Sequence, residues 1–280
     1  MKELNYKELD EFIKAALDED IGTGDITTNY CVPKFAISTG SFIAKEAGVI
    51  SGLSVLCRVF QLIDETVDVT LMVNDGDAVS AGDVIAKING PSRAILTGER
   101  TALNILQHMS GIATKTAKAV QEISNTNTKI LDTRKTTPGM RALDKYAVTC
   151  GGGTNHRFNL ADGILIKDNH IQAAGSITNA VQAMKNAKVK SSIGIEVETE
   201  TLEQVEEAIA AGADIVMLDN MSHDLIAQAV KLINGRAKTE ASGNMGDHSL
   251  EDVAKTGVDY ISIGALTHSV KAMDISLKFK

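Results

Sequence analysis

Cysteine is scarce in this sequence, and its cysteines follow no pattern that a disulfide framework or a metal site requires. Cys31, Cys57 and Cys150 are odd in number, lie far apart, and fall outside any Cys-x-x-Cys or cysteine-histidine ligand spacing. This usage is typical of a reduced, intracellular protein. Cys150 lies beside three glycines and is a candidate nucleophile, but a lone cysteine without an activating neighbour is more often a packed residue.

Long apolar runs are also missing. No stretch approaches the roughly eighteen consecutive apolar residues of a membrane-spanning helix. Residues 1–20 form a charged amphipathic pattern without the apolar core of a signal peptide. We therefore expect a soluble, cytoplasmic protein with no membrane partner.

A net positive charge is absent as well. The chain has 28 basic and 36 acidic residues, a formal charge of −8, which repels nucleic acids and anionic membrane surfaces. Residues 129–170 reverse this balance, with seven Lys or Arg against four Asp. The sequence therefore excludes nucleic acid as a partner and favours a small anionic ligand.

Neither a G-x-G-x-x-G fingerprint nor a Walker phosphate loop occurs. After residue 129, short apolar strands alternate with helical stretches at intervals of about one strand, one helix and two loops, which predicts a parallel sheet. Polar residues follow nearly every strand, which favours a barrel over an open doubly wound sheet. Six strands predict an incomplete barrel, and their residue ranges are 129–133, 162–168, 192–199, 214–219, 237–242 and 258–264.

The first part of the chain has a different pattern. Residues 35–90 consist of β-rich runs separated by Asp-Gly and Ala-Gly turns, and residues 97–122 read as a helix with a break near Ser110 and Gly111. The phrase "NDGDAVSAGDVIAKI" resembles a lipoyl-type half barrel, but no lysine occupies a hairpin tip. The predicted fold is α/β: an incomplete parallel α/β barrel (113–269) preceded by a smaller α+β sandwich domain (1–112), with residues 270–280 packing back on that first domain.

The ends of the predicted strands carry the candidate site residues, because loops at the carboxyl ends of parallel strands share one mouth. Cations come first, carboxylates follow, and glycines come last, an order that suits a polyanion, a hard cation such as Mg²⁺, and a phosphate. The candidates are Arg134, Lys135, Lys167, Glu198, Asp219, Ser242, Gly243, Asn244, Gly264 and His268.

Each candidate also has a structural interpretation. Arg134 and Lys135 could form a solvated loop, and Asp219 could cap a helix. Glu196 and Glu198 lie on one face of a strand, so one of them could be a buried structural carboxylate while the other meets a ligand. The combination favours a site, because compatible chemistry at six strand ends is improbable for solvation alone.

At these residues the sequence resembles the quinolinate phosphoribosyltransferase family, the decarboxylating nicotinate-nucleotide pyrophosphorylases. The matching motifs cover nearly the whole chain in order. They are "EDIGTGDITT" (19–28), "GERTALNILQHMSGIAT" (98–114), "LDTRKTTPGMRALDKYAV" (131–148), "GGGTNHRFNLADGILIKDNHI" (151–171), "IEVET" (195–199), "MLDN" (217–220), "EASGN" (240–244) and "ISIGALTHS" (261–269).

The resemblance implies a glycosyltransferase of NAD biosynthesis that uses quinolinate, phosphoribosyl pyrophosphate and Mg²⁺. It implies Lys135, Lys167, Glu198 and Asp219 as catalytic residues, with Glu198 and Asp219 near the metal. It also implies a homodimer or higher oligomer in which Arg100 reaches the site of a neighbouring subunit. Further substrate-binding residues implied in this way are Thr133, Arg134, His156, Arg157, Ser242, Gly243, Asn244, Gly264 and His268.

Two alternatives stay open at the level of sequence. One is a related phosphoribosyltransferase that accepts a different pyridine or imidazole acid, or a molybdenum-associated homologue, since such enzymes share the phosphate residues. The cluster of Arg100, Arg134, His156, Arg157 and Lys167 favours a dicarboxylate. The other is a non-catalytic anion-binding or carrier protein, suggested by the lipoyl-like stretch near residues 74–90.

Overall fold

The chain folds into two units, each with its own sheet. The structure is a computed structural model that describes residues 4, 6–187, 194–247 and 249–279. Unit 1 comprises Met1–Ala117, Thr137–Gly152 and Ser269–Lys280, and unit 2 comprises Lys118–Thr136 and Gly153–His268. The sequence prediction placed one boundary between residues 112 and 113. In the structure the chain passes between the units after residues 117, 136, 152 and 268.

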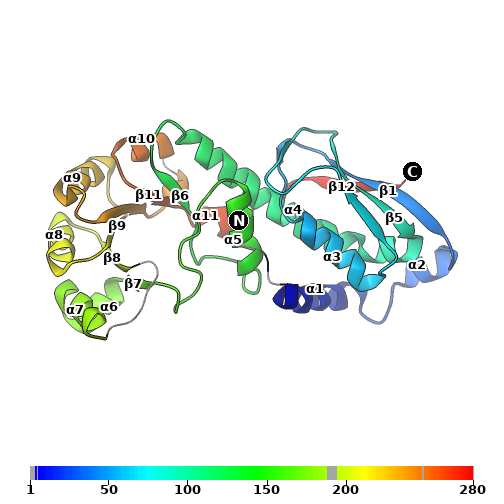
Figure 1. Cartoon of the computed structure of the whole chain (residues 1–280), viewed down its shortest axis with the longest axis horizontal. Coiled ribbons are helices and arrows are strands. Elements are labelled where there is room, and N and C mark those ends of the chain that lie inside the picture. The colour runs from blue at the N-terminus through cyan, green and yellow to red at the C-terminus, as the bar shows by residue number, and fades with distance from the viewer. Residues whose placement is uncertain (1–3, 5, 188–193, 248, 280) are drawn as a thin grey trace. The chain divides into compact units, whose positions relative to one another are not determined.

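Unit 1 contains a four-stranded sheet in the order β12-β1-β5-β3 and a two-stranded sheet of β2 and β4, with antiparallel pairing throughout (Figure 1). Its elements are α1 (Tyr6–Ile21), α2 (Ile26–Cys31), β1 (Ile37–Ala44), β2 (Gly48–Val49), α3 (Leu53–Ile63), β3 (Asp68–Leu71), β4 (Ala78–Val79), β5 (Val84–Pro91), α4 (Ser92–Glu122, whose last turn belongs to unit 2), α5 (Arg141–Cys150) and β12 (Ile275–Phe279).

The core of unit 1 lies between the four-stranded sheet and α3. Phe42 of β1 and Phe60 of α3 are fully buried, and their ring centroids lie 6.1 Å apart. Phe42 is flanked in the sheet by Ala86 of β5 and Leu277 of β12. Residues 270–280, for which the sequence predicts a return to the first domain, therefore include the edge strand β12.

The helix α3 was not among the elements predicted from the sequence. It occupies the stretch between two predicted β-rich runs. Its apolar residues Leu53, Leu56 and Phe60 recur at helical spacing and are buried. The Asp75 side chain accepts hydrogen bonds from the backbone N–H groups of Gly52 and Leu53 at 2.9 and 3.0 Å, so a residue outside the helix satisfies its first donors.

The predicted break in the long helix near residue 110 is wrong, because α4 continues through Ser110 and Gly111. Ser110 is buried and its hydroxyl bonds to both the N–H and the carbonyl of Ser51, at 3.1 and 3.2 Å. A Cβ at Gly111 would lie 2.2 Å from the carbonyl oxygen of Lys271. The Ser-Gly pair therefore permits a close approach of the chain instead of a kink.

Unit 2 contains one six-stranded parallel sheet in the order β6-β11-β10-β9-β8-β7. Its elements are β6 (Lys129–Leu131), β7 (Ile164–Ile166), α6 (Asp168–Ala174), α7 (Ile177–Ala187), β8 (Ile195–Thr199), α8 (Leu202–Ala211), β9 (Ile215–Asp219), α9 (His223–Ile233), β10 (Lys238–Ser242), the 3₁₀ turn η1 (Met245–Asp247), α10 (Leu250–Lys255), β11 (Tyr260–Ser262) and α11 (Ala265–His268).

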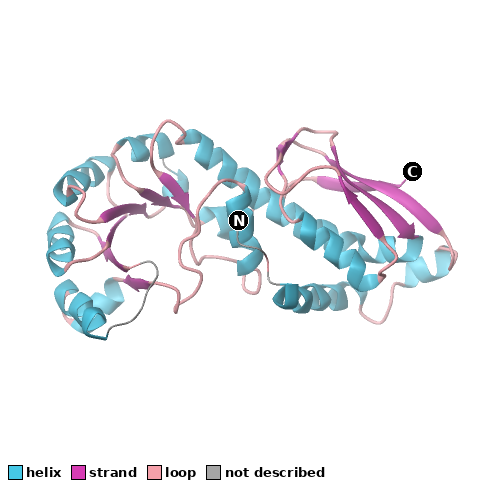
Figure 2. Ribbon diagram, viewed as in Figure 1, coloured by secondary structure: helices cyan, strands magenta, loops and turns pink. Residues whose placement is uncertain are grey.

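This sheet confirms the predicted mixed α/β fold with an incomplete parallel barrel. Each strand from β7 to β11 pairs with the next, β11 pairs with β6, and β6 does not pair with β7 within the described residues. The helices α7 to α10 lie on the outer side of the curved sheet (Figure 2). All six predicted strands occur, although residues 192 and 193, the start of one of them, lie outside the described residues.

Local sequence signals start and stop the outer helices. Serine or threonine side chains accept a hydrogen bond from the backbone N–H three residues later, which stabilises a helix by about 1 kcal/mol. α8 ends at Gly212 with φ of +83°, and β9 begins three residues later. These short connections align the carboxyl ends of the strands along one edge. The capping residues are Thr201, Ser222 and Ser249.

Among the described residues, no helix combines the length and the apolar composition that crossing a bilayer requires.

Candidate active site

Apart from Arg100, every site residue predicted from the sequence lies in unit 2. Most of them lie on or soon after the carboxyl ends of its strands, whereas His156 and Arg157 lie in the loop between α5 and β7. Asp219 and Ser242 are the last residues of β9 and β10, and Glu198 is the penultimate residue of β8. Lys167 directly follows β7, and Gly264 lies two residues after β11. Parallel strands end at the same edge, so the sheet gathers these residues at one mouth. Arg100 lies on α4 in unit 1 and is exposed.

Lys167 and Glu198 form an ion pair between neighbouring strands. The pairing of Ile166 with Val197 in β7 and β8 brings the two side chains together. The backbone N–H of Lys167 also donates to Nδ1 of His170 at 2.9 Å, which fixes the turn into α6. The ammonium of Lys167 remains partly exposed, so it can also meet an anion at the mouth.

The turns after β9 and β10 interlock. The N–H of Asn220 donates to the carbonyl of Ser242 at 3.0 Å, and its side-chain amide donates to Oδ2 of Asp219 at 2.7 Å. Gly243 has φ of +93°, and a Cβ there would lie 2.3 Å from Oδ1 of Asn220. Asn244 follows in the left-handed region with φ of +49°. Glycine at position 243 lets the backbone of the two turns approach closely.

A third group joins the loop after β6 to the loop after β11. A Cβ at Gly264 would lie 2.9 Å from Cδ of Lys135 and 3.1 Å from Cδ2 of His268, so glycine lets these two side chains approach. The hydroxyl of Thr267 donates to the carbonyl of Lys135 at 2.8 Å. Thr133 accepts a hydrogen bond from the N–H of Lys135 at 3.0 Å, which closes the turn at the end of β6.

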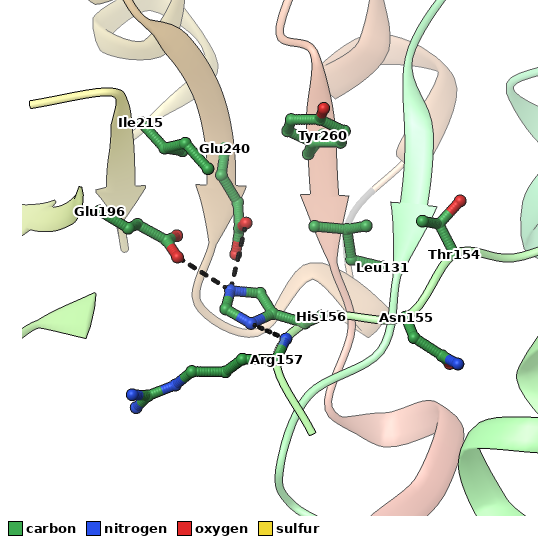
Figure 3. Close-up of a pocket in the computed structure, with 9 residues that line it drawn as sticks. All are labelled: Leu131, Thr154, Asn155, His156, Arg157, Glu196, Ile215, Glu240 and Tyr260. Atoms are coloured by element: carbon green, nitrogen blue, oxygen red, sulfur yellow. Dashed lines mark hydrogen bonds and ion pairs between the residues drawn. The ribbon is translucent and has the colours of Figure 1, made fainter. Parts of the chain in front are cut away.

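A pocket of about 280 Å³ lies deeper in unit 2 (Figure 3). At its centre the His156 ring lies between two carboxylates: Nε2 is 3.1 Å from Oε2 of Glu196 and 3.6 Å from Oε2 of Glu240. Burial, and then the charge of Glu196, raise the pKa of Glu240 to about 8, against the opposing effect of His156. The lining residues are Leu131, Thr154, Asn155, His156, Arg157, Glu196, Ile215, Glu240 and Tyr260.

Arg157 borders this pocket and is only 7% exposed. Its Nη1 donates to the carbonyl of Gly163 at 3.0 Å. Burial, followed by the positive charge of Arg134, lowers the pKa of Arg157, while the charge of Glu196 acts in the opposite direction. Nε of Arg134 is buried without a hydrogen-bond partner among the described residues. Two adjacent guanidinium groups with an unused donor are suited to an anion.

Two groups of side chains in unit 2 offer ligand atoms for a metal ion. Glu198 and Asp219 offer carboxylates on the adjoining strands β8 and β9, a donor type that Mg²⁺ prefers. His156, Glu196 and Glu240 bring one nitrogen and two oxygens within 4.8 Å of one another. In this second group Nε2 of His156 already contacts both carboxylates, at 3.1 and 3.6 Å.

Three residues of the site were not among the predicted ones. Asp132 is fully buried and accepts the N–H of His156 at 2.8 Å. Glu196 and Glu240 are each 1% exposed, which makes Glu196 the buried member of its pair with Glu198. The available signal was a charged residue in the middle of an otherwise buried strand, as in "KTEAS". For Cys150, the packed interpretation is confirmed, since the residue is buried and burial raises the pKa of its thiol to about 11.

Comparisons with known proteins agree with this arrangement. The family described as "Quinolinate phosphoribosyl transferase, C-terminal domain" matches residues 112–278, and its N-terminal domain matches residues 25–110. The chain belongs to the quinolinate phosphoribosyl transferase family. The sequence-based assignment to this family is therefore confirmed.

Relatives in this family are similar over most of their length. The probable nicotinate-nucleotide pyrophosphorylase [carboxylating] of Bacillus subtilis (strain 168) is 47% identical, over 98% of this chain and 94% of its own. Quinolinate phosphoribosyltransferase [decarboxylating] 2b, mitochondrial, of Nicotiana tabacum is 44% identical, over 97% and 82%. The structure of nicotinate-nucleotide pyrophosphorylase from Francisella tularensis superposes with a TM-score of 0.94 at 42% identity, over 99% and 98%. NadC from Streptococcus pyogenes has a TM-score of 0.93 at 46% identity, over 100% and 99%.

Proposed function

We propose that the chain transfers the phosphoribosyl group of phosphoribosyl pyrophosphate to quinolinate with loss of CO₂, giving nicotinate mononucleotide and pyrophosphate in NAD biosynthesis. The names of the relatives, carboxylating and decarboxylating, describe this reaction in its two directions. The proposal depends on one observation. This chain belongs to the quinolinate phosphoribosyl transferase family, and its cations, carboxylates and glycine turns lie at one edge of the sheet of unit 2. An acidic chain needs such local cations to hold two anionic reactants together.

The geometry supports different roles for the two sides of the mouth. The adjacent Arg134 and Arg157 suit the two carboxylates of quinolinate, because guanidinium groups bind carboxylates through two parallel hydrogen bonds. On the phosphoribosyl side, Lys135 and Lys167 provide positive charge. The residues assigned to phosphate and ribose are Thr133, Ser242, Gly243, Asn244, Gly264 and His268.

Mg²⁺ is the proposed cofactor, held by Glu198 and Asp219. Mg²⁺ bound there would neutralise negative charge on the pyrophosphate. Lys135 and Lys167 add charge stabilisation as the bond between ribose C1 and pyrophosphate breaks and C1 gains oxocarbenium character. Arg134 and Arg157 hold the pyridine ring so that its nitrogen attacks C1.

Decarboxylation follows ribosylation in this scheme. The C–C bond to the carboxylate next to the ring nitrogen breaks, CO₂ leaves, and the electron pair stays on the ring carbon until it takes up a proton. The N-ribosylated nitrogen is positive and stabilises that pair, whereas the neutral ring does not. The cations near the ring bind both the leaving and the remaining carboxylate before this step.

We also propose that the protein works as a homodimer or higher oligomer with Arg100 shared between subunits. Arg100 is exposed on α4 in unit 1, while the remaining site residues lie in unit 2. Several large apolar side chains of unit 1 are exposed, including Ile26 at 72% and Tyr30 and Phe35 at 87% each. Burial of such residues between subunits stabilises an oligomer. The cytoplasmic location stays a prediction.

The test of the function is turnover by the purified chain. We expect formation of nicotinate mononucleotide and CO₂ from quinolinate, phosphoribosyl pyrophosphate and Mg²⁺, and little product with nicotinate in place of quinolinate. Arg157→Ala should raise KM for quinolinate or abolish turnover. Equal turnover of nicotinate would favour a related transferase, and binding of quinolinate without any product would favour a non-catalytic anion-binding protein.

A further inference from the structure

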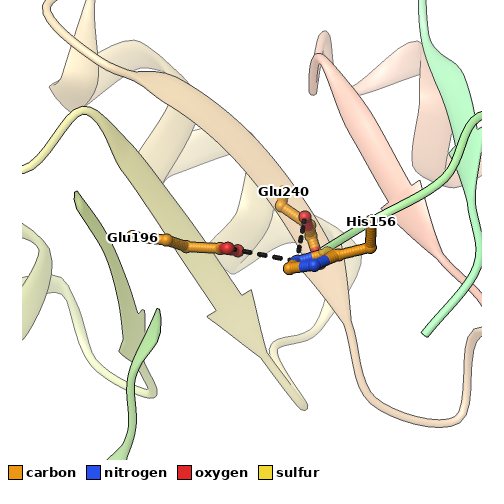
Figure 4. A group of neighbouring side chains, drawn as sticks. All are labelled: His156, Glu196 and Glu240. Carbon is orange, nitrogen blue, oxygen red and sulfur yellow. Dashed lines mark ion pairs between the residues drawn. The ribbon is translucent and has the colours of Figure 1, made fainter. Parts of the chain in front are cut away.

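Two buried glutamates lie beside the proposed quinolinate site and take no part in the reaction as proposed. Glu196 on β8 and Glu240 on β10 are each 1% exposed, and both point at the ring of His156 (Figure 4). In each of them Oε1 is buried without a hydrogen-bond partner among the described residues. Two carboxylates buried together are costly unless nearby groups gain from their charge.

Both nitrogens of the His156 ring are engaged. Nδ1 accepts the backbone N–H of Arg157 at 2.7 Å, so in a neutral ring the proton is on Nε2. Nε2 faces Glu196 and Glu240 at 3.1 and 3.6 Å, which is the arrangement that stabilises a proton at that position. In this geometry Nε2 of His156 meets two carboxylates of its own chain.

The contacts of His156 help to fix the position of Arg157. Its backbone N–H is held by His156, and its guanidinium is buried against the carbonyl of Gly163. Burial, and then the charge of Arg134, lower the pKa of Arg157, and the charge of Glu196 acts in the opposite direction. The buried carboxylate of Glu196 therefore stabilises the charge of Arg157 before an anionic ligand arrives.

We propose that Glu196 and Glu240 are positioning residues of the quinolinate site, which act through His156 to hold Arg157 in place. The inference rests on the proposed function for the identity of the ligand. The surroundings of Glu240 agree with a positioning role. The groups that face Glu240 are Glu196 from β8, His156 from the loop after α5, and Tyr260 and Ser262 from β11. Burial, and then the charge of Glu196, raise the pKa of Glu240 to about 8, so Glu240 favours its protonated form at neutral pH.

The test compares Glu196→Gln, Glu196→Ala, Glu240→Gln and Glu240→Ala with the wild type. Glu122→Gln is the matched control, since Glu122 is a structural glutamate of unit 2 whose Oε1 accepts the N–H of Leu250 at 2.7 Å. We expect Glu196→Gln to raise KM for quinolinate roughly tenfold or more, because a displaced binding group costs of that order. KM for phosphoribosyl pyrophosphate should stay within about twofold of the wild-type value.

The two glutamates should respond differently to conservative replacement. At pH 7, Glu240→Gln should resemble the wild type, because glutamine resembles a protonated carboxyl, whereas Glu240→Ala should raise KM for quinolinate. Glu196→Gln keeps an acceptor but loses the charge, so it should bind quinolinate less tightly than the wild type and more tightly than Glu196→Ala. A loss of folding alone would lower the apparent kcat and leave both KM values unchanged.

A second readout does not depend on turnover. In ¹⁵N-histidine spectra of the full chain, with His156→Gln to assign the signal, Nδ1 of His156 should be unprotonated in the wild type and change its shift in Glu196→Ala. A wild type in which Nδ1 of His156 carries the proton overturns the proposal. The proposal is also overturned if all the Glu196 and Glu240 variants have the same KM for quinolinate as Glu122→Gln. A wild type that does not convert quinolinate at all refutes the proposed function, while the spectra still decide how Arg157 is held.

Discussion

At the scale of single residues, the turn after β10 depends on glycine at position 243. We expect Gly243→Ala to lower stability by more than the roughly 1–2 kcal/mol that left-handed backbone costs a residue with a Cβ, because the new atom would also lie 2.3 Å from Oδ1 of Asn220. Activity should fall as the phosphate turn distorts. Denaturant unfolding and steady-state kinetics measure the two effects.

Gly235→Ala is the control for that change. Gly235 lies in the same unit with φ of +73°, and a Cβ there would meet nothing within 4 Å. It isolates the cost of the backbone conformation from the cost of the clash. Equal losses of stability in Gly235→Ala and Gly243→Ala would show that the contact with Asn220 contributes nothing.

Glu240 predicts a pH dependence of stability at the same scale. Its pKa is raised from 4.5 to about 8 in the folded chain, so its protonated form favours folding. This contribution is fully present below pH 4.5 and is lost as the pH rises through about 8. Glu240→Gln removes the titration. The Tm of Glu240→Gln relative to the wild type should therefore be higher at pH 9 than at pH 6.

Other titratable groups are shared by both proteins and cancel in this difference. Glu122→Gln, measured at the same two pH values, controls for a glutamate-to-glutamine change elsewhere in unit 2. A Tm difference for Glu240→Gln that does not change between pH 6 and pH 9 would contradict the buried, proton-holding role of Glu240.

At the scale of elements, Gly111 shows why α4 is unbroken. Glycine inside an exposed helix costs about 1 kcal/mol relative to alanine, so Gly→Ala normally stabilises a helix. Here we expect Gly111→Ala to destabilise the protein, because its Cβ would lie 2.2 Å from the carbonyl oxygen of Lys271. Asn104→Ala, at an exposed position of α4, should be neutral or slightly stabilising. Thermal unfolding of both variants measures these effects. A higher Tm for Gly111→Ala than for the wild type would contradict the close approach of Gly111 to Lys271.

The same helix marks the limit of prediction from sequence at this scale. The strands of unit 2 could be predicted because each is a short apolar run with a polar residue at its end, and local pattern determines both features. The Ser-Gly pair of α4 looks locally like a break, and only a segment about 160 residues away in the chain explains it. Likewise, nothing within "LSVLCRVFQLI" shows that Asp75 caps that helix.

In the candidate site, too, the features set by local pattern could be predicted from the sequence and the long-range contacts could not. Residues at strand ends, such as Lys167 and Glu198, could be found because parallel strands end at one edge. Glu196 could be singled out as one of a pair, but its burial and its contact with His156 depend on how the barrel curves. Glu240 meets the same histidine from a strand that is not a neighbour of β8. Contacts across the inside of a barrel cannot be predicted from local sequence patterns.

At the scale of the whole molecule, residues 129–170 carry seven Lys or Arg against four Asp in an acidic chain, and Arg100 alone of the proposed site residues lies in unit 1. If subunits share sites, mixing inactive Arg100→Ala with inactive Lys167→Ala should restore activity. In randomly exchanged dimers, half of the molecules are mixed and each has one intact site, so about a quarter of wild-type activity is expected.

Lys167→Ala mixed with Arg157→Ala is the matched control for that experiment. Both residues belong to unit 2 of one chain, so every site in a mixed dimer carries one of the two substitutions, and no activity should return. Subunit exchange is followed independently with two affinity tags. Recovery in the first mixture alone places Arg100 in the neighbouring subunit's site. Exchange without recovery in either mixture means that each chain completes its own site, and Arg100 then acts within the chain that carries it.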